Sequence, residues 1–306
     1  MDYIKPMNAV DLSRQDVKKK HDKLNHVLNC GEYIVQRKIQ GNRMDILFRV
    51  QGNELITRGG HFKGLWLPPL TVPMEDLHGT QLTGEIFHPN YNDNQLAGLL
   101  NRNAKPIEDE ILKGMRLYVF DIVKWKGDDC YHARQIERIG MLMRMQKRLH
   151  AENFHIRVLP AMQFNTAMDA LKLFDSVVSE GGEGIMLKHK DAVYQPGKRP
   201  ENTWYKLKKT FTIDVFIIGF NPGEGKYKGM VGSVQCGIYK GDQVIHLCNV
   251  SGFDDVTRYD ITNNKVKWRM RVIEVCGFVK TSTSMREPRF VQVRDDKEPR
   301  ECVIDE

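Results

Sequence analysis

The pattern of apolar residues changes near residue 210, and this change constrains the fold more than any other feature of the sequence. Before it, strand-like runs are mixed with long helical patterns; after it, only short alternating runs appear. A chain of 306 residues also exceeds the usual size of one domain. The sequence therefore predicts two domains, residues 1–210 and residues 211–306, with the Lys209–Ile213 segment as the junction.

The first part mixes helices and strands. Apolar residues at helical spacing predict a helix over residues 11–28, which Ser13 or Asp11 could cap. Two further helices are expected at Gln135–Glu152 and Ala167–Ser179. Period-two alternation between turn signals predicts strands at Tyr33–Lys38, Arg43–Val50, Glu54–Thr57, Gln81–Phe87, Arg116–Val123, Gly184–Lys188 and Thr203–Lys208.

The second part consists of short alternating runs separated by Gly, Asn, Asp and Lys. Five or so short strands in about a hundred residues predict a small β-barrel, and their order is compatible with an OB-fold. The runs are Val215–Phe220, Val231–Tyr239, Val244–Val250 and Arg269–Val279.

The net charge of +7 and the isoelectric point of about 9.0 favour a polyanionic partner. All of the surplus lies in residues 1–209, which hold 32 basic and 25 acidic residues, whereas residues 210–306 hold 14 of each. It is concentrated in Arg14–Lys23 and Lys188–Lys209. A charge run is usually a solvated face, so each segment alone favours nucleic acid only weakly.

Several classes of protein are disfavoured. No stretch approaches the roughly 20 apolar residues of a membrane helix, and the polar start at Met1–Val10 lacks a signal core. The six scattered cysteines form no Cys-x-x-Cys pair and are interpreted as structural thiols. We therefore expect a cytoplasmic protein with no membrane partner, and a monomer because the sequence shows no signal for an oligomer.

The segment from Lys38 to Arg43 (Lys-Ile-Gln-Gly-Asn-Arg) is the first candidate for chemistry. Lys38 ends a strand and Gly41 allows a tight turn, so that Arg43 can return to the site of the lysine amine. An ordinary lysine, with a pKa of about 10.4, needs nearby cations or desolvation to become a nucleophile. Alone, this hexapeptide is a weak signal, and a solvated lysine is the alternative.

Further candidates follow along the chain. Lys206 and Lys208 alternate in one strand, so their amines project from the same face. Taken singly, a carboxylate in a strand could be a surface group and an aromatic residue could belong to the core. The other candidates are Arg58, Glu85, Phe120 and Glu183. Because all of the candidates lie in or beside predicted strands in this order, an explanation of each as an ordinary surface or core residue is poor.

This order resembles that of the ATP-dependent DNA ligases, over nearly the whole chain from about residue 30. The resemblance includes a Tyr-Gln-Pro-Gly-Lys-Arg stretch at Tyr194–Arg199 and segments at Arg286–Phe290 and Arg294–Lys297. Two residues depart from the family pattern: Gln40 and Thr83 each stand where the family usually has Asp. The amide at Gln40 carries no charge, so metal preference or rate could differ.

The resemblance implies an α+β fold: an adenylation (nucleotidyltransferase) domain of antiparallel sheets flanked by helices, then a small β-barrel OB-fold domain. It also implies a reaction in three steps. Lys38 takes AMP from ATP, the AMP passes to the 5′-phosphate of a nick, and the 3′-hydroxyl displaces it. Each step transfers a phosphoryl group, so positioning and charge neutralisation supply most of the acceleration.

Residue roles follow from the same resemblance. Lys38 is the nucleophile, and Glu85 and Glu183 are expected to hold the metal, Mg²⁺ with Mn²⁺ as a possible substitute. Phe120 is expected to stack on adenine. The remaining nucleotide contacts are expected from Arg43, Arg58, Glu85, Glu183, Lys206 and Lys208, with Arg294 and Lys297 of the second domain orienting pyrophosphate in the first step only. That division of labour requires the second domain to swing between two poses.

The small size resembles that of minimal viral and bacterial ligases, which implies a bacterial or virus-infected cell as the setting. Nicked duplex DNA is the expected partner. The residues expected to contact its phosphates are Lys18, Lys19, Lys20, Lys198 and Arg199. Phosphate contacts give affinity but no specificity for the base sequence. Two alternatives stay open: an mRNA-capping guanylyltransferase or RNA ligase, and a non-catalytic DNA-binding protein on the same scaffold. Tyr194–Arg199 and Pro288-Arg289-Phe290 favour DNA ligase over the first. Joint retention of Lys38, Glu183, Lys206 and Lys208 argues against the second.

Overall fold

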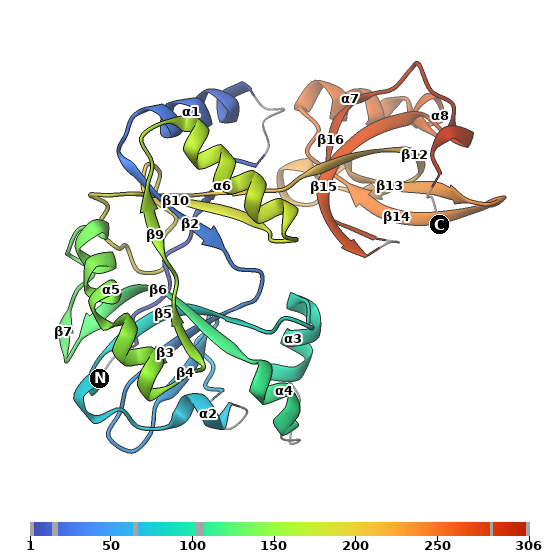
Figure 1. Cartoon of the computed structure of the whole chain (residues 1–306). Helices are drawn as coiled ribbons and strands as arrows, with labels where there is room; N and C mark the ends of the chain where they lie inside the picture. Colours follow the sequence, from blue (N-terminus) through green and yellow to red (C-terminus); the bar gives the residue numbers. More distant parts are fainter. Residues whose placement is uncertain (1–2, 14–17, 64–66, 102–106, 282–283, 304–306) are drawn as a thin grey trace. The chain divides into compact units, whose positions relative to one another are not determined.

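The computed structural model describes residues 3–13, 18–63, 67–101, 107–281 and 284–303 (Figure 1). The chain divides into two compact units, Met1–Lys208 and Lys209–Glu306. This division falls two residues before the boundary expected from the sequence. Among the described residues, no helix has the length and apolar character needed to cross a membrane.

One sheet of the first unit has five strands in the order β1-β11-β10-β2-β9. Neighbours are antiparallel except β1 and β11, which are parallel. Helices α1 (Lys18–Asn29) and α6 (Ala167–Ser179) supply apolar residues to the core on one face of this sheet, as Figure 1 shows. The strands are β1 (Val10–Asp11), β2 (Tyr33–Lys38), β9 (Ala161–Gln163), β10 (Gly184–His189) and β11 (Trp204–Lys208).

Alternation along these strands decides what the opposite face carries. Tyr205 and Leu207 enter the core beside α1 and α6, so Lys206 and Lys208 project from the other face. By the same rule Val35 is in that core, whereas Gln36 and Lys38 point away from it. The lysines expected to act together therefore do share one face.

The second sheet of this unit has the order β4-β3-β5-β6-β7, with β8 (Ile156–Val158) parallel to β6. Its inner face packs against helices in a core that includes Ile46, Leu82, Leu117 and Leu142. The strands are β3 (Asn42–Leu47), β4 (Glu54–Thr57), β5 (Gln81–Phe87), β6 (Arg116–Trp125) and β7 (Asp128–Asp129). The helices are α2 (Pro68–Thr71), α3 (Asp93–Leu100), α4 (Asp109–Gly114) and α5 (Gln135–Glu152), with a 3-10 turn at Glu75–Leu77.

A buried polar network ties the two sheets together. Arg138 of α5 and Asp121 of β6 form an ion pair at 2.9 Å, and neither side chain is exposed. Gln135 bonds to both partners and accepts a hydrogen bond from the Trp204 indole of β11 at 2.6 Å. Because every strong donor and acceptor here has a partner within the network, the polar groups can be buried without a large penalty.

The second unit is a five-stranded antiparallel sheet in the order β14-β13-β12-β15-β16. Register shifts interrupt three of its pairings, and such bulges bend strands, which curls the sheet until β14 and β16 are in contact. The elements are β12 (Phe211–Pro222), β13 (Val231–Lys240), β14 (Gln243–Val250), α7 (Asp255–Asn263), α8 (Lys265–Trp268), β15 (Val272–Thr281) and β16 (Ser284–Val293), with 3-10 turns at Gly225–Tyr227 and Pro299–Glu301.

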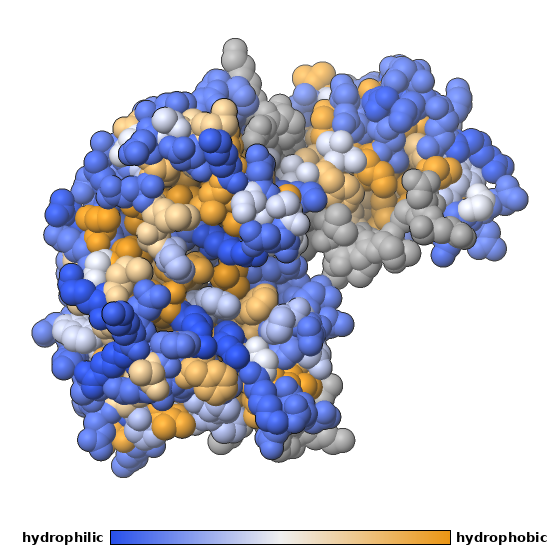
Figure 2. Space-filling model, in the orientation of Figure 1, coloured by the Kyte–Doolittle hydropathy of each residue, from blue (hydrophilic) through white to orange (hydrophobic). Residues whose placement is uncertain are grey.

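The expected fold class, α+β with antiparallel sheets, flanking helices and a final curled sheet, is confirmed. On the visible face, Figure 2 shows mostly hydrophilic side chains over the first unit, with hydrophobic ones gathered near its middle. All six cysteines are free, and four of them are buried.

Candidate functional site

Lys38 is held by Glu183 across a strand pair. Its amine donates to the Glu183 carboxylate at 2.5 Å. Strands β2 and β10 pair with Gly184 opposite Lys38, which places Glu183 beside the amine. Gly184 has φ +141°, and a Cβ there would lie 2.2 Å from the Leu207 carbonyl oxygen. Glycine after Glu183 is therefore needed for the backbone path that presents the carboxylate to the lysine.

Two more lysines reach the same place from β11. Lys208 is opposite Gly184 in the register, and its amine lies 3.9 Å from Glu183. Lys206 lies two residues earlier on the same face of the strand. Both amines are also close to the carboxylate of Asp11, at 3.3 Å for Lys206 and 3.6 Å for Lys208. Three cations thus meet two carboxylates, a surplus of positive charge that suits a phosphate.

The second sheet contributes Arg43 and Glu85, which are directly opposite each other in the β3–β5 register. Arg43 contacts the buried carboxylate of Asp45 at 3.1 Å and the Tyr194 hydroxyl at 3.3 Å. Burial raises the pKa of Glu85 to about 7, against the opposing charges of Lys38 and Arg43. A cation that binds beside Glu85 would lower this pKa and favour the ionised carboxylate. Gly41 permits the turn, because a Cβ there would lie 2.1 Å from the Ile86 carbonyl oxygen.

Phe120 lies among cations and rings. The Arg43 guanidinium is 5.0 Å and the Lys188 amine 4.7 Å from the ring centroid, and Trp204 is edge-on at 6.3 Å. Burial lowers the pKa of Lys188 to about 7, and its amine donates to the Phe120 carbonyl oxygen. Adenine stacking by Phe120 stays a prediction. Tyr118, two residues earlier on the same strand, is the aromatic residue of β6 that lines the cavity beside Lys38.

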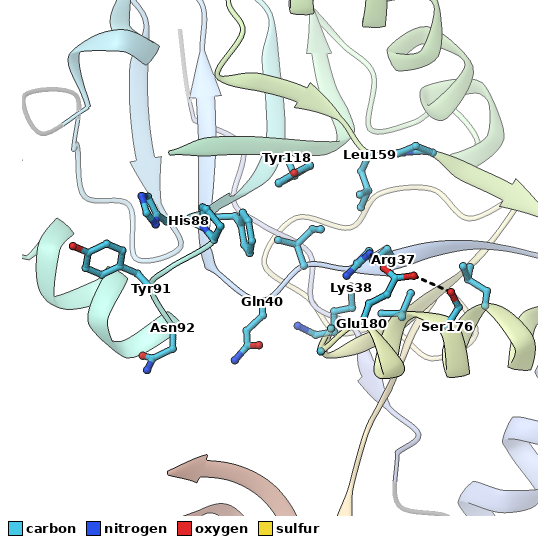
Figure 3. A pocket seen from close by; sticks show the side chains of 18 of the residues that line it. Arg37, Lys38, Gln40, His88, Tyr91, Asn92, Tyr118, Leu159, Ser176 and Glu180 are labelled. Carbon is cyan, nitrogen blue, oxygen red and sulfur yellow. Dashed lines mark hydrogen bonds and ion pairs between the residues drawn. The ribbon is translucent and has the colours of Figure 1, made fainter. Parts of the chain in front are cut away.

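That cavity has a volume of about 800 Å³ and is lined by residues of the first unit (Figure 3). Lys38 and Gln40 line it along the β2–β3 turn, and Tyr118 and Leu159 lie on another side in this view. Gln40, which stands in place of the family's usual Asp, is exposed there. Glu180 lines it near the end of α6 and accepts a hydrogen bond from Arg37.

Gln36 precedes Lys38 by two residues on the same face of β2. Its side-chain amide is 1% exposed, and its nitrogen donates to the Leu159 carbonyl oxygen at 3.0 Å. Among the described residues its side-chain oxygen has no hydrogen-bond partner. A buried unpaired acceptor is costly, about 1–3 kcal/mol, so this oxygen needs a donor that the described residues do not supply.

Other residues expected from the sequence lie apart from this cluster. Arg58 is exposed and donates to Asn8 at 2.7 Å rather than to the clustered residues. Lys198 and Arg199 are exposed in the loop between β10 and β11. Lys18–Lys20 form the first turn of α1, although the side chains of Lys18 and Lys19 lie outside the described part of the structure.

The two basic segments of the sequence come together. Lys23, on α1, donates a hydrogen bond to the side-chain oxygen of Asn202, in the same loop as Lys198 and Arg199. Segments nearly 180 positions apart therefore lie together beside β11. We call Lys20, Lys23, Lys198 and Arg199 on these segments the basic border; counting charges along the sequence does not show that the two segments meet.

In the second unit, Arg294 and Lys297 share a single carboxylate. Asp214 of β12 lies 3.0 Å from the Arg294 guanidinium and 2.5 Å from the Lys297 amine. Asp296 also binds Arg294 at 2.8 Å. A hydrogen bond from Lys297 to Asp214 raises the pKa of that lysine, so it is firmly protonated. The two cations are thereby fixed side by side.

Four residues of the site were not singled out from the sequence for chemistry: Asp11, Gln36, Asp45 and Tyr118. Period-two spacing gave a usable signal for three of them. Gln36, Asp45 and Tyr118 each lie two residues from a residue that was identified, namely Lys38, Arg43 and Phe120. Asp11 had no such signal, because its partners are almost 200 residues away.

The first unit has two mostly antiparallel sheets that gather a strand-end lysine, carboxylates and further lysines, and a curled five-stranded sheet follows it. This arrangement defines a nucleotidyltransferase domain joined to an OB-fold. The family model for the ATP-dependent DNA ligase domain matches residues 15–208. The chain belongs to this family.

Similar sequences and similar solved structures are also ligases. The DNA ligases of Saccharolobus islandicus and Saccharolobus solfataricus are 27% identical to it over 254 residues, which is 67% of this chain but 41% of theirs. The chain thus spans well under half the length of these relatives. The structure named Pmar-Lig_Pre. has a TM-score of 0.77 at 19% identity, covering 95% of this chain and 68% of its own. A Lig E DNA ligase has a TM-score of 0.65 at 19% identity, covering 96% of this chain and 100% of its own. The ligase domain of LigD from M. tuberculosis has a TM-score of 0.53 at 21% identity, covering 99% of this chain and 98% of its own. At such identities these likenesses establish the fold alone.

Proposed function

We propose that this chain seals nicks in duplex DNA, with AMP carried first on Lys38 and then on the 5′-phosphate of the nick. The observation that carries the proposal is the Lys38 amine, bound to Glu183 at 2.5 Å within a cluster that also holds Lys206 and Lys208. Such a cluster offers one nucleophile together with the charge that phosphoryl transfer requires.

In the first step the Lys38 nitrogen forms a bond to the α-phosphorus of ATP, and the bond to the leaving pyrophosphate breaks. The amine must lose a proton, and Glu183 is placed to receive it through their hydrogen bond. Lys206 and Lys208 project from one strand face and neutralise charge on the phosphate oxygens. The AMP then passes to the DNA 5′-phosphate, and the 3′-hydroxyl displaces it to form the phosphodiester.

A divalent metal fits the carboxylates present. Mg²⁺ in proteins is commonly bound by one or two carboxylates together with substrate phosphates. Glu85 and Glu183 interact electrostatically in this cluster, and the raised pKa of Glu85 would be relieved by a cation. Among the described residues no group of three or more His, Cys, Asp or Glu side chains is placed to hold a metal ion. Bound there, Mg²⁺ would neutralise phosphate charge.

DNA binding is supported by the basic border beside β11. Lys20 and Lys23 of α1 and the exposed Lys198 and Arg199 lie on two segments that Lys23 and Asn202 connect. Contacts of this kind act on phosphates and read no sequence, which suits an enzyme that must accept any nick.

The choice of base separates this proposal from a GTP-dependent capping enzyme. The buried Gln36 side-chain oxygen needs a donor. The exocyclic amine of adenine can supply one, whereas guanine has a carbonyl oxygen at the same ring position. We therefore expect ATP to be preferred.

The test is incubation with α-labelled ATP or GTP, a denaturing gel, and a sealing assay on nicked duplexes. We expect covalent label from ATP, little from GTP, and sealed product. Label from GTP alone would indicate a capping enzyme, and no label from either would indicate a non-catalytic scaffold. Label without sealing of DNA, but with joining of RNA strands, would indicate an RNA ligase.

A second prediction concerns Arg294 and Lys297. The family resemblance assigns both residues to pyrophosphate in the first step only, and Asp214 fixes their side chains as one cationic pair. Joint replacement by alanine should slow adenylation by about 100-fold or more, the scale of losing preorganised charge stabilisation. Sealing of a nick that already carries 5′-AMP should change much less.

The matched control is the joint replacement of Lys265 and Arg269, two exposed cations of the same unit, by alanine. This pair removes the same charge and should leave both rates near normal. Equal loss of both rates in the Arg294/Lys297 variant would assign the pair to DNA binding or to folding of the unit instead.

A further inference from the structure

Asp11 occupies an unexpected place. The sequence suggested that Asp11 or Ser13 caps the first helix, but α1 as described begins at Lys18, and residues 14–17 lie outside the described part. The described contacts of both residues lie on the sheet. Strand β1 runs parallel to β11 with Asp11 beside Lys206, and Ser13 accepts a hydrogen bond from the Lys208 backbone at 2.8 Å.

The Asp11 carboxylate is fixed at both of its oxygens. One accepts the Ser13 backbone hydrogen at 2.9 Å, and the other lies 3.3 Å and 3.6 Å from the amines of Lys206 and Lys208. Burial by itself would raise the pKa of Asp11, but the hydrogen bonds from Ser13 and the two lysine charges lower it overall. Asp11 is therefore a carboxylate anion held against the two lysines.

We propose that Asp11 is a positioning residue that acts as a built-in counter-anion for Lys206 and Lys208. The inference rests on the proposed function, in which this lysine pair binds the α-phosphate. Asp11 keeps the amines in place when no nucleotide is bound, and it weakens their hold on any incoming phosphate. Phosphate bound in the ground state must then share the lysines with Asp11.

The arrangement has a functional consequence. Tight ground-state binding of a phosphate does not raise the rate of its transfer, and it slows the release of AMP to the next acceptor. A fixed carboxylate limits that binding while it holds both lysines in the position that the transition state requires. Removing the charge but keeping the shape, as in Asp11→Asn, should therefore strengthen binding and lower the maximal rate.

AMP is the probe that isolates this effect, because it carries the α-phosphate but no leaving group, so no transfer can occur. Calorimetric titrations should show AMP binding Asp11→Asn about 10-fold more tightly than the unaltered chain. Adenosine, which lacks the phosphate, should bind both equally. Asp22→Asn, on the exposed side of α1, makes the same charge change and should alter neither titration.

Kinetics give the second measurement. In single-turnover adenylation, Asp11→Asn should lower both the half-saturating ATP concentration and the maximal rate, and Asp11→Glu should restore part of each. A purely structural role for Asp11 would instead lower activity without tightening AMP binding. The inference is overturned if the unaltered chain binds AMP but Asp11→Asn binds it no more tightly than Asp22→Asn does. A chain that binds no AMP and takes no label from ATP would overturn the proposed function as well.

Discussion

Lys38→Ala should abolish covalent labelling by ATP and the sealing of an ordinary nick. The alanine variant lacks the nitrogen that would form the bond to phosphorus, and losses on removing a catalytic nucleophile are about 10⁴-fold or more. In the proposed function the neighbouring Lys206 and Lys208 neutralise the phosphate oxygens rather than attack phosphorus, and Asp11 holds both of their amines in that place. The measurement is label retained on a denaturing gel after incubation with α-labelled ATP.

Two further variants sharpen this result. Lys38→Arg keeps a positive charge beside Glu183, but a guanidinium stays protonated and should form no adenylate. Lys190→Ala removes a partly exposed lysine of the same unit that pairs with Glu32, and it should label normally. Label that persists in Lys38→Ala, at a level close to that of Lys190→Ala, would assign the nucleophile to another residue.

Local sequence signals were sufficient for much of the first unit. The strands β2, β4 and β5 and the helices α5 and α6 have the bounds expected from the sequence, because each has clean period-two or helical spacing between turn residues. Strand β16 was not expected. It contains Glu287, Pro288 and Arg289 in succession, and this polar run hides the alternation of its apolar residues. Helices α7 and α8 are short and were not expected from the sequence.

The site was predictable where the chain itself sets the spacing and unpredictable where the register sets it. Lys206 and Lys208 share a face because of their two-residue spacing, which any sequence shows. That Arg43 lies opposite Glu85, or that Asp11 lies beside Lys206, depends on which strands pair and how they are aligned. Those relations join segments from about 40 to almost 200 residues apart, and tertiary packing decides them.

The buried ion pair between Asp121 and Arg138 should have the largest effect on stability. Asp121→Ala leaves the Arg138 guanidinium without its carboxylate in a position where neither side chain is exposed. Breaking one side of a buried pair typically costs about 3–5 kcal/mol, because an uncompensated charge stays in the interior. Gln135 and Trp204 belong to the same network, so the junction of β6 and β11 should loosen with it.

Urea unfolding followed by tryptophan fluorescence, with Trp204 at this junction, measures the loss. Glu152→Ala is the matched control, since Glu152 pairs with Arg148 on the exposed side of the same helix and its removal should leave the unfolding midpoint almost unchanged. The double variant Asp121→Ala/Arg138→Met removes both charges and fills the space with an apolar chain, so it should be more stable than Asp121→Ala alone. If the double variant is instead less stable by the sum of the two single changes, the charge left on Arg138 is not the cause of the loss. The network would then stabilise the fold through packing around α5 rather than through its paired charges.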